Sequence, residues 1–119
     1  MGMTYINVEI ANPAKPKVHE KVKLLVDSGA LYSVIPRNLI NKLGIKPYKS
    51  ETFYLANGDE ITRDIGDAVF FYQDKRGPSK VILGKPGDTA LMGVVTLESL
   101  GYALDPLRRE LKPLKMLLV

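Results

Sequence analysis

The 119-residue chain has no cysteine and no tryptophan, and it contains a single histidine, His19. The absence of cysteine excludes disulfide scaffolds, thiolate zinc sites, iron–sulfur clusters and cysteine nucleophiles. One histidine is too few for an ordinary transition-metal site, and the acidic residues lack the spacing of a calcium-binding EF-hand. We therefore expect neither a metal nor a cofactor.

Long apolar runs are also missing, so the sequence predicts no membrane span. The first residues lack a basic segment followed by an apolar one, and a cytoplasmic location is the default expectation. The net charge is +4, with four basic residues and one acidic residue after Pro106. Since no basic stripe with interleaved aromatic residues accompanies this tail, we expect no nucleic-acid partner.

Other catalytic motifs are weak in this chain. A serine triad would have to use His19, and no Gly-X-Ser-X-Gly elbow supplies the serine. His19 is therefore interpreted as an exposed residue at a strand end. Residues 83–87 contain glycines and a lysine but lack the spacing of a phosphate-binding loop, so they are interpreted as a tight turn.

The hydrophobic pattern predicts one all-β domain, residues 1–119, with two short helices. Strands are expected at residues 6–10, 18–26, 51–56, 60–65, 67–73 and 80–83, and helices at 36–43 and 96–100. An apolar run at residues 90–94 leads into the second helix. Asn57-Gly58 is the strongest hairpin signal, because both residues tolerate positive φ. Two more hairpins are expected, one turning at 75–78 and one at 105–106 that returns through 111–119.

Asp27 is the residue most suited to chemistry. By itself, Asp27-Ser28-Gly29 at a strand end is usually only an Asx-turn. Here the aspartate directly follows the apolar run that ends at Val26, where a carboxylate loses solvation unless hydrogen bonds or a function compensate. Ser28 offers a hydroxyl to hold the loop, and Gly29 lets backbone N–H groups approach the carboxylate. These are the requirements of a rigidly held acid–base aspartate.

Residues 25–30, Leu-Val-Asp-Ser-Gly-Ala, resemble the hydrophobic-hydrophobic-Asp-Thr/Ser-Gly-Ala signature of aspartic proteases. More narrowly, they resemble the single-lobe, retropepsin-like branch that includes the retroviral proteases. Five further segments resemble family features in the same order. Residues 33–36 resemble the segment after the catalytic loop, 55–59 the flap tip, and 90–93 the second hydrophobic-hydrophobic-Gly motif, which packs behind the catalytic loop in this family. Residues 96–101 resemble the family's helix and 104–114 the C-terminal hairpin of prokaryotic members. The resemblance spans residues 5–114. Ser28 replaces the commoner threonine but keeps its hydroxyl, and residues 115–119 match no family feature.

The resemblance implies a retropepsin-like acid protease fold, a closed or partly open barrel with one or two short helices and a flap hairpin. It implies that Asp27 is catalytic and that Ser28, Gly29 and Ala30 support the catalytic loop. It also implies that Ala56, Asn57 and Gly58 form a substrate-binding flap, whereas the pattern alone favours an ordinary surface hairpin. Three aromatic residues either line subsites or belong to the core: Tyr32, Phe53 and Tyr54.

Aspartic proteolysis needs two neighbouring carboxylates that share one proton, yet this chain has one Asp-Ser-Gly motif. The other aspartates are expected in solvated turns or exposed positions: Asp59, Asp64, Asp67, Asp74, Asp88 and Asp105. The second carboxylate is then Asp27 of another copy, in a homodimer with two-fold symmetry that cleaves polypeptides. The apolar end, residues 116–119, either contributes to that interface or packs on its own barrel.

Two other classes of function stay open. A barrel of this type can be a catalytically silent dimer that binds peptides or another protein. Alternatively, a non-enzymatic β-barrel can bind acidic partners through its basic tail, and a steep salt dependence of nucleic-acid binding would favour this reading.

Overall fold

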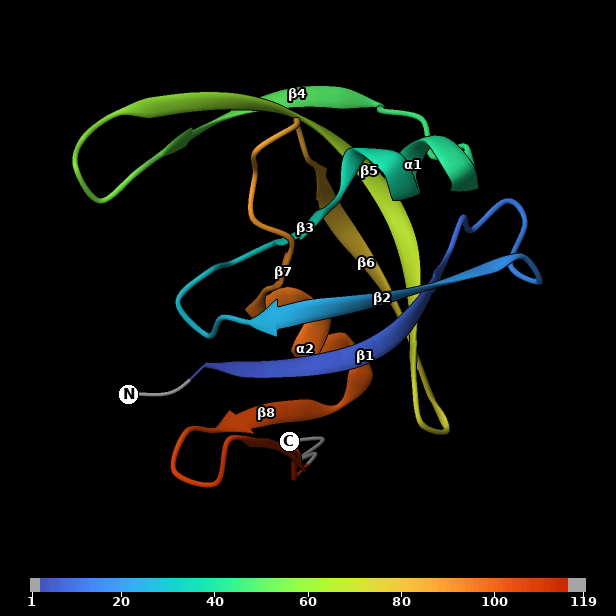
Figure 1. The fold of residues 1–119 in the computed structure, drawn as a ribbon, viewed down its shortest axis with the longest axis vertical. Helices are drawn as coiled ribbons and strands as arrows, with labels where there is room; N and C mark the ends of the chain where they lie inside the picture. Colours follow the sequence, from blue (N-terminus) through green and yellow to red (C-terminus); the bar gives the residue numbers. More distant parts are fainter. Residues whose placement is uncertain (1–2, 116–119) are drawn as a thin grey trace.

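A computed structural model of the chain describes residues 3–115. It is mostly β with two short helices, and this part of the predicted fold class is confirmed (Figure 1). The strands are β1 Thr4–Ala11, β2 His19–Val26, β3 Ser33–Ile35, β4 Lys49–Tyr54, β5 Glu60–Tyr72, β6 Lys75–Leu83, β7 Leu91–Met92, β8 Tyr102–Asp105 and β9 Glu110–Pro113. The helices are α1 Arg37–Leu43 and α2 Val94–Leu100. Among the described residues, no helix has the length and apolar character needed to cross a membrane.

The first two strands form an antiparallel pair in register from Thr4 opposite Val26 to Ala11 opposite His19. The alternating apolar residues of β1 point into the core, as the period of two predicts. Because of this register, the end of β2 that leads into Asp27 lies beside the beginning of β1.

Seven strands form one sheet in the order β1-β2-β7-β3-β6-β5-β4, and β5 also pairs with β1. The short strand β7 lies between β2 and β3, parallel to the first and antiparallel to the second. The two segments that flank the Asp27 loop therefore share one neighbour, although that neighbour is more than 50 residues later in the chain.

The strands between residues 60 and 83 differ from the prediction. One strand, β5, replaces the two expected at 60–65 and 67–73, because Gly66 pairs within the sheet and does not turn. A Cβ on Gly66 would lie 3.1 Å from Ile45 and 3.2 Å from Leu83, so the glycine serves a close approach. The turn expected at 75–78 is also wrong. The chain reverses at Gln73, which adopts a left-handed φ of 54°, and β6 already begins at Lys75.

Both helices are present with shifted starts. Pro36 precedes α1 as its extended N-cap, one residue before the helix begins, and Gly44 ends it with a left-handed φ of 66°. The helix expected at 96–100 begins at Val94 and ends at Leu100, with Gly101 as its left-handed C-cap. Helix α2 packs against β6 and β8 and covers one side of the core (Figure 1).

The last two strands form a separate two-stranded sheet. Asp105 stabilises their turn, because its Oδ1 accepts hydrogen bonds from the backbone N–H groups of Leu107 and Arg108 at 3.1 and 3.2 Å. The turn expected at 105–106 is thus confirmed. The predicted return strand reached residue 119, and its last four residues lie outside the described part of the chain.

Candidate active site

Asp27 lies immediately after β2, and its side chain is partly exposed. The backbone N–H of Gly29 donates a 2.9 Å hydrogen bond to Asp27 Oδ1. A Cβ on Gly29 would lie 3.3 Å from the same oxygen, so the glycine leaves room for this approach. The backbone of Asp27 is also fixed, since its N–H donates to the carbonyl of Met92 at 2.9 Å. The carboxylate is therefore oriented both by its own loop and by β7.

The loop that follows Asp27 rests on the beginning of α2. The N–H groups of Val94 and Val95 donate to the carbonyls of Ala30 and Leu31 at 2.9 and 3.0 Å. Gly93 makes this contact possible, because a Cβ there would lie 2.6 Å from the backbone carbon of Tyr32. The expectation that residues 90–93 pack behind the loop is confirmed by these contacts.

Three buried hydroxyl groups lie under the loop, and the sequence did not single them out. Thr96 Oγ1 lies 2.5 Å from Ser33 Oγ and 2.9 Å from Ser79 Oγ. Ser33 Oγ also accepts a hydrogen bond from the N–H of Gly93 at 3.0 Å. No local pattern marks these residues, because Thr96 lies 63 residues from Ser33 and 17 from Ser79 in the sequence. This hydroxyl cluster (Ser33, Ser79 and Thr96) joins β3, β6 and α2.

Ser28 directly follows Asp27 in the loop. Its side chain is exposed, and within the described part of the chain its hydroxyl makes no hydrogen bond. In one copy of the chain the loop is instead held by Gly29 and by the segment from Met92 to Val95.

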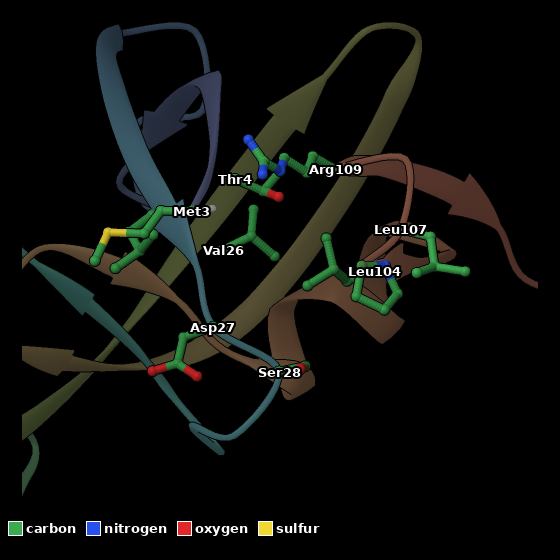
Figure 2. A pocket seen from close by; sticks show the side chains of 10 residues that line it. Met3, Thr4, Val26, Asp27, Ser28, Leu104, Leu107 and Arg109 are labelled. Carbon is green, nitrogen blue, oxygen red and sulfur yellow. The ribbon is translucent and has the colours of Figure 1, made fainter. Parts of the chain in front are cut away.

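Asp27 and Ser28 line an open hollow of about 530 Å³ beside the β8–β9 turn. Figure 2 shows Met3 on one side of this hollow, Leu104 and Leu107 on the other, and Val26 between them. Among the described residues that line it, Asp27 is the only carboxylate. We call this region the Asp27 hollow.

The hairpin between β4 and β5 turns at Asn57-Gly58, as predicted. Gly58 has a φ of 90°, and Asn57 Oδ1 accepts a 2.9 Å hydrogen bond from the N–H of Asp59. Ala56, Asn57 and Gly58 are all exposed. In Figure 1 this hairpin and the loop after β2 extend toward the same side of the molecule.

Aromatic and charged side chains connect the hairpin to the loop after Asp27. The rings of Tyr32 and Phe53 meet edge to face, with centroids 6.3 Å apart, and Lys80 Nζ lies 4.8 Å from the centre of the Tyr32 ring. Glu51 accepts hydrogen bonds from Lys49 and Lys80, and these bonds lower its pKa. Tyr54 does not join this group, because it is largely exposed.

A second ion pair holds β5 to the loop between β6 and β7. Arg63 donates to both carboxylate oxygens of Asp88, at 2.7 and 2.8 Å, and the N–H of Lys85 adds a third bond. The guanidinium and, less strongly, the Lys85 N–H lower the pKa of Asp88 from 3.8 to about 2. The expectation that Asp88 is merely solvated is wrong, since its side chain is 22% exposed and doubly hydrogen-bonded to Arg63.

His19 lies at the first position of β2, at the opposite end of that strand from Asp27. It stacks on Phe71 at 4.1 Å, and its Nδ1 lies 3.0 Å from Glu9 Oε1. The interpretation of His19 as a strand-end residue, outside the site, is confirmed.

Comparison with known proteins shows which protein family the chain belongs to. The family model described as "Aspartyl protease" matches residues 6–71, more than half of the chain and including Asp27. The chain therefore belongs to the aspartyl protease family.

Comparison with solved structures describes the fold more specifically. The chain is similar to the crystal structure of a retropepsin-like aspartic protease from Rickettsia conorii, with a TM-score of 0.55 and 24% identity over 87% of this chain and 77% of that one. Its fold is thus retropepsin-like. A search of curated proteins gave no match.

Proposed function

We propose that this protein is an aspartic endopeptidase that acts as a homodimer, with one Asp27 from each chain. The observation that carries this proposal is the position of Asp27. It is held by a backbone N–H and by β7, and it is the only carboxylate among the described residues lining the open hollow. Half of the required pair is present and oriented in each copy.

The proposed chemistry follows from two neighbouring carboxylates. Since two like charges a few ångströms apart cannot both ionise easily, the pair shares one proton. The ionised Asp27 accepts a proton from a water molecule, which attacks the carbonyl carbon of the scissile peptide bond. The protonated Asp27 polarises the carbonyl oxygen by donating a hydrogen bond to it. When the resulting tetrahedral intermediate collapses, the C–N bond breaks and the amine nitrogen takes a proton from the carboxyl pair as it leaves. No covalent intermediate with the protein forms.

The remaining residues position this pair and the substrate. Ser28, Gly29 and Ala30 form the loop that holds the carboxylate at the end of β2. Ala56, Asn57 and Gly58 form the tip of a flap that covers a bound polypeptide and donates or accepts backbone hydrogen bonds. The contact between Tyr32 and Phe53 supports this role, because it connects the flap strand β4 to the loop after Asp27.

Symmetry explains how one motif per chain is sufficient. A two-fold axis close to Asp27 brings the two copies of that residue together and needs no second motif. We also propose that residues 1–119 form one domain whose sheet closes, wholly or in part, into a barrel. Support comes from β5, which pairs with β6 and also with β1.

The direct test is Asp27→Asn. The amide oxygen of asparagine can still accept the Gly29 N–H, so the loop and the dimer should persist while peptide cleavage is lost. Cleavage of a diverse peptide library is measured for both proteins, with Asp74→Asn in the exposed turn between β5 and β6 as a matched control that should stay active. Equal cleavage by the wild type and Asp27→Asn would refute the protease assignment. A dimer without any cleavage would favour the silent binding module.

A mixing experiment tests whether both chains contribute. If each active site needs two copies of Asp27, equal amounts of exchanged wild type and Asp27→Asn leave about one quarter of the dimers active. If each chain works alone, activity stays at about one half. The two results are distinguished by measuring the initial rate against the fraction of wild-type chains.

A further inference from the structure

Two exposed apolar side chains stand at the Asp27 hollow. Leu107, in the β8–β9 turn, is 94% exposed, and Met3, just before β1, is 67% exposed. Both residues line the hollow, together with the less exposed Leu104 and Val26 (Figure 2). A protruding leucine beside an apolar hollow marks a surface that fits a partner.

The position of Asp27 limits which partner fits. The inference rests on the proposed function, in which the two-fold axis passes close to Asp27. Surfaces that line the same hollow as Asp27 then face the equivalent surfaces of the second chain. An apolar projection and an apolar recess on one surface allow such self-pairing, because each copy supplies both.

The charges of the turn are also compatible with self-pairing. Asp105 and Glu110 balance Arg108 and Arg109, so the segment carries no net charge. Asp105 Oδ2 lies 4.0 Å from Arg108, within the turn itself. Two copies of this turn can therefore approach each other without the repulsion that a turn of one sign would cause.

We propose that the β8–β9 turn is a dimerisation element and that its partner is a second copy of this chain. Leu107 of each copy enters the Asp27 hollow of the other, between Met3 and Leu104. The same contact that buries these side chains brings the two copies of Asp27 together.

The first test compares Leu107→Asp with Val18→Asp. Val18 is similarly apolar and 53% exposed, but it precedes β2 at the end opposite Asp27. We expect Leu107→Asp to raise the dimer dissociation constant at least about a hundredfold, because the substitution acts twice in a two-fold interface. Val18→Asp should leave the constant unchanged. The constant is measured by sedimentation equilibrium, and circular dichroism checks that both variants fold.

The expected peptidase activity of Leu107→Asp is low at dilute protein and returns as concentration rises. An unchanged dissociation constant for Leu107→Asp would overturn the proposed surface, whether or not the protein cleaves peptides. A wild type that dimerises through Leu107 without cleaving anything would leave the surface standing and refute the proposed function. A wild type that stays monomeric at every concentration would overturn both.

Cross-linking provides a second test that does not disturb the charge. Because the chain has no cysteine, Leu107→Cys in one chain and Met3→Cys in another can be joined only between copies. A short bifunctional maleimide should yield a covalent heterodimer from this mixture and little from Leu107→Cys mixed with Val18→Cys. Equal yields from the two mixtures would contradict the proposed contact.

Discussion

The loop after β2 and the tip of the β4–β5 hairpin are both turns, but they are held in different ways. The loop donates a hydrogen bond to the carbonyl of Met92 and accepts hydrogen bonds from the N–H groups of Val94 and Val95. These residues are distant in the sequence, and the loop also packs against Gly93. Among the described residues, the hairpin tip makes hydrogen bonds only within residues 55–59, and its three central residues are exposed. Contacts with distant segments therefore fix the loop after β2, whereas the hairpin tip depends on hydrogen bonds within the turn itself.

This difference corresponds to the two proposed roles. A carboxylate that shares a proton with its symmetry mate has to be held within a narrow range of positions. A flap has to open for a polypeptide and close over it, so its tip belongs to the less stable part of the structure. Substitutions in the two regions can test whether the stabilities really differ in this way.

The largest effect is expected from Gly93→Ala. The added Cβ would lie 2.6 Å from the Tyr32 backbone carbon and 2.8 Å from the Leu31 carbonyl oxygen, and neither atom can rotate away. We expect a loss of about 3 kcal/mol in the free energy of unfolding, measured by urea denaturation.

Gly58→Ala is the matched change at the hairpin tip. Its Cβ would meet nothing within 4 Å, so only the positive φ of 90° opposes it. A loss of about 1 kcal/mol is expected. Equal losses of stability in Gly93→Ala and Gly58→Ala would contradict the view that tertiary contacts hold the loop after β2 more firmly than the hairpin tip.

The next largest effect is expected from Thr96→Val. Valine has nearly the same shape but removes the hydroxyl that joins Ser33 to Ser79, leaving buried hydroxyls short of a partner. The expected loss is about 2 kcal/mol in the same measurement.

Thr52→Val is its control in the hairpin. Thr52 Oγ1 lies 3.1 Å from Thr62 Oγ1 in an exposed cross-strand pair, where water can replace the lost contact. The change should stay within about 0.5 kcal/mol. A large loss of stability in Thr52→Val and none in Thr96→Val would contradict the proposal that the region under the Asp27 loop is held more firmly than the hairpin.

The ion pair between Arg63 and Asp88 gives a pH-dependent effect of intermediate size. Because the pKa of Asp88 falls from 3.8 to about 2 in the folded protein, its contribution is complete above about pH 4 and is lost as the pH falls toward 2. We expect the pair to contribute about 1–2 kcal/mol, since the carboxylate is still partly exposed.

Urea unfolding of the wild type and of Asp88→Asn at about pH 6 and about pH 2 checks this contribution. Other carboxylates titrate in both proteins and largely cancel from the difference. The stability advantage of the wild type should therefore shrink at the lower pH, and an advantage that is the same at both values would contradict the assignment.

The sequence predicted those parts of the fold that local chemistry determines. The alternation in β1 and the Asn57-Gly58 turn were visible because each needs a particular residue type at a particular place. The turn at Gln73 was missed, since glutamine is not a usual residue for a left-handed φ. The break predicted between strands at Gly66 was wrong, because residue type alone does not distinguish a glycine that allows close packing from one that allows a turn.

The candidate site was predicted only in part. Asp27 was singled out because a carboxylate after an apolar strand is costly unless hydrogen bonds or a function compensate, and because residues 25–30 resemble the aspartic protease signature. The hydroxyl cluster and the pair of Arg63 with Asp88 were not found, because their members lie 17 to 63 residues apart and no local pattern marks them. Contacts of this kind depend on the tertiary fold, which one sequence does not specify residue by residue.

The smallest effect on stability is expected from Asn57→Ala at the hairpin tip. Within residues 3–115, the Asn57 side chain bonds only to Asp59, and both side chains are exposed. The free energy of unfolding should therefore fall by no more than about 0.5 kcal/mol. Activity should respond more than stability. The Asn57 side chain orders the tip, and without it kcat/KM for peptide cleavage should fall about two- to tenfold, mainly through a higher KM. If Asn57→Ala instead destabilised the protein as much as Thr96→Val and left cleavage unchanged, the tip would be a structural element and its role as a flap would be refuted.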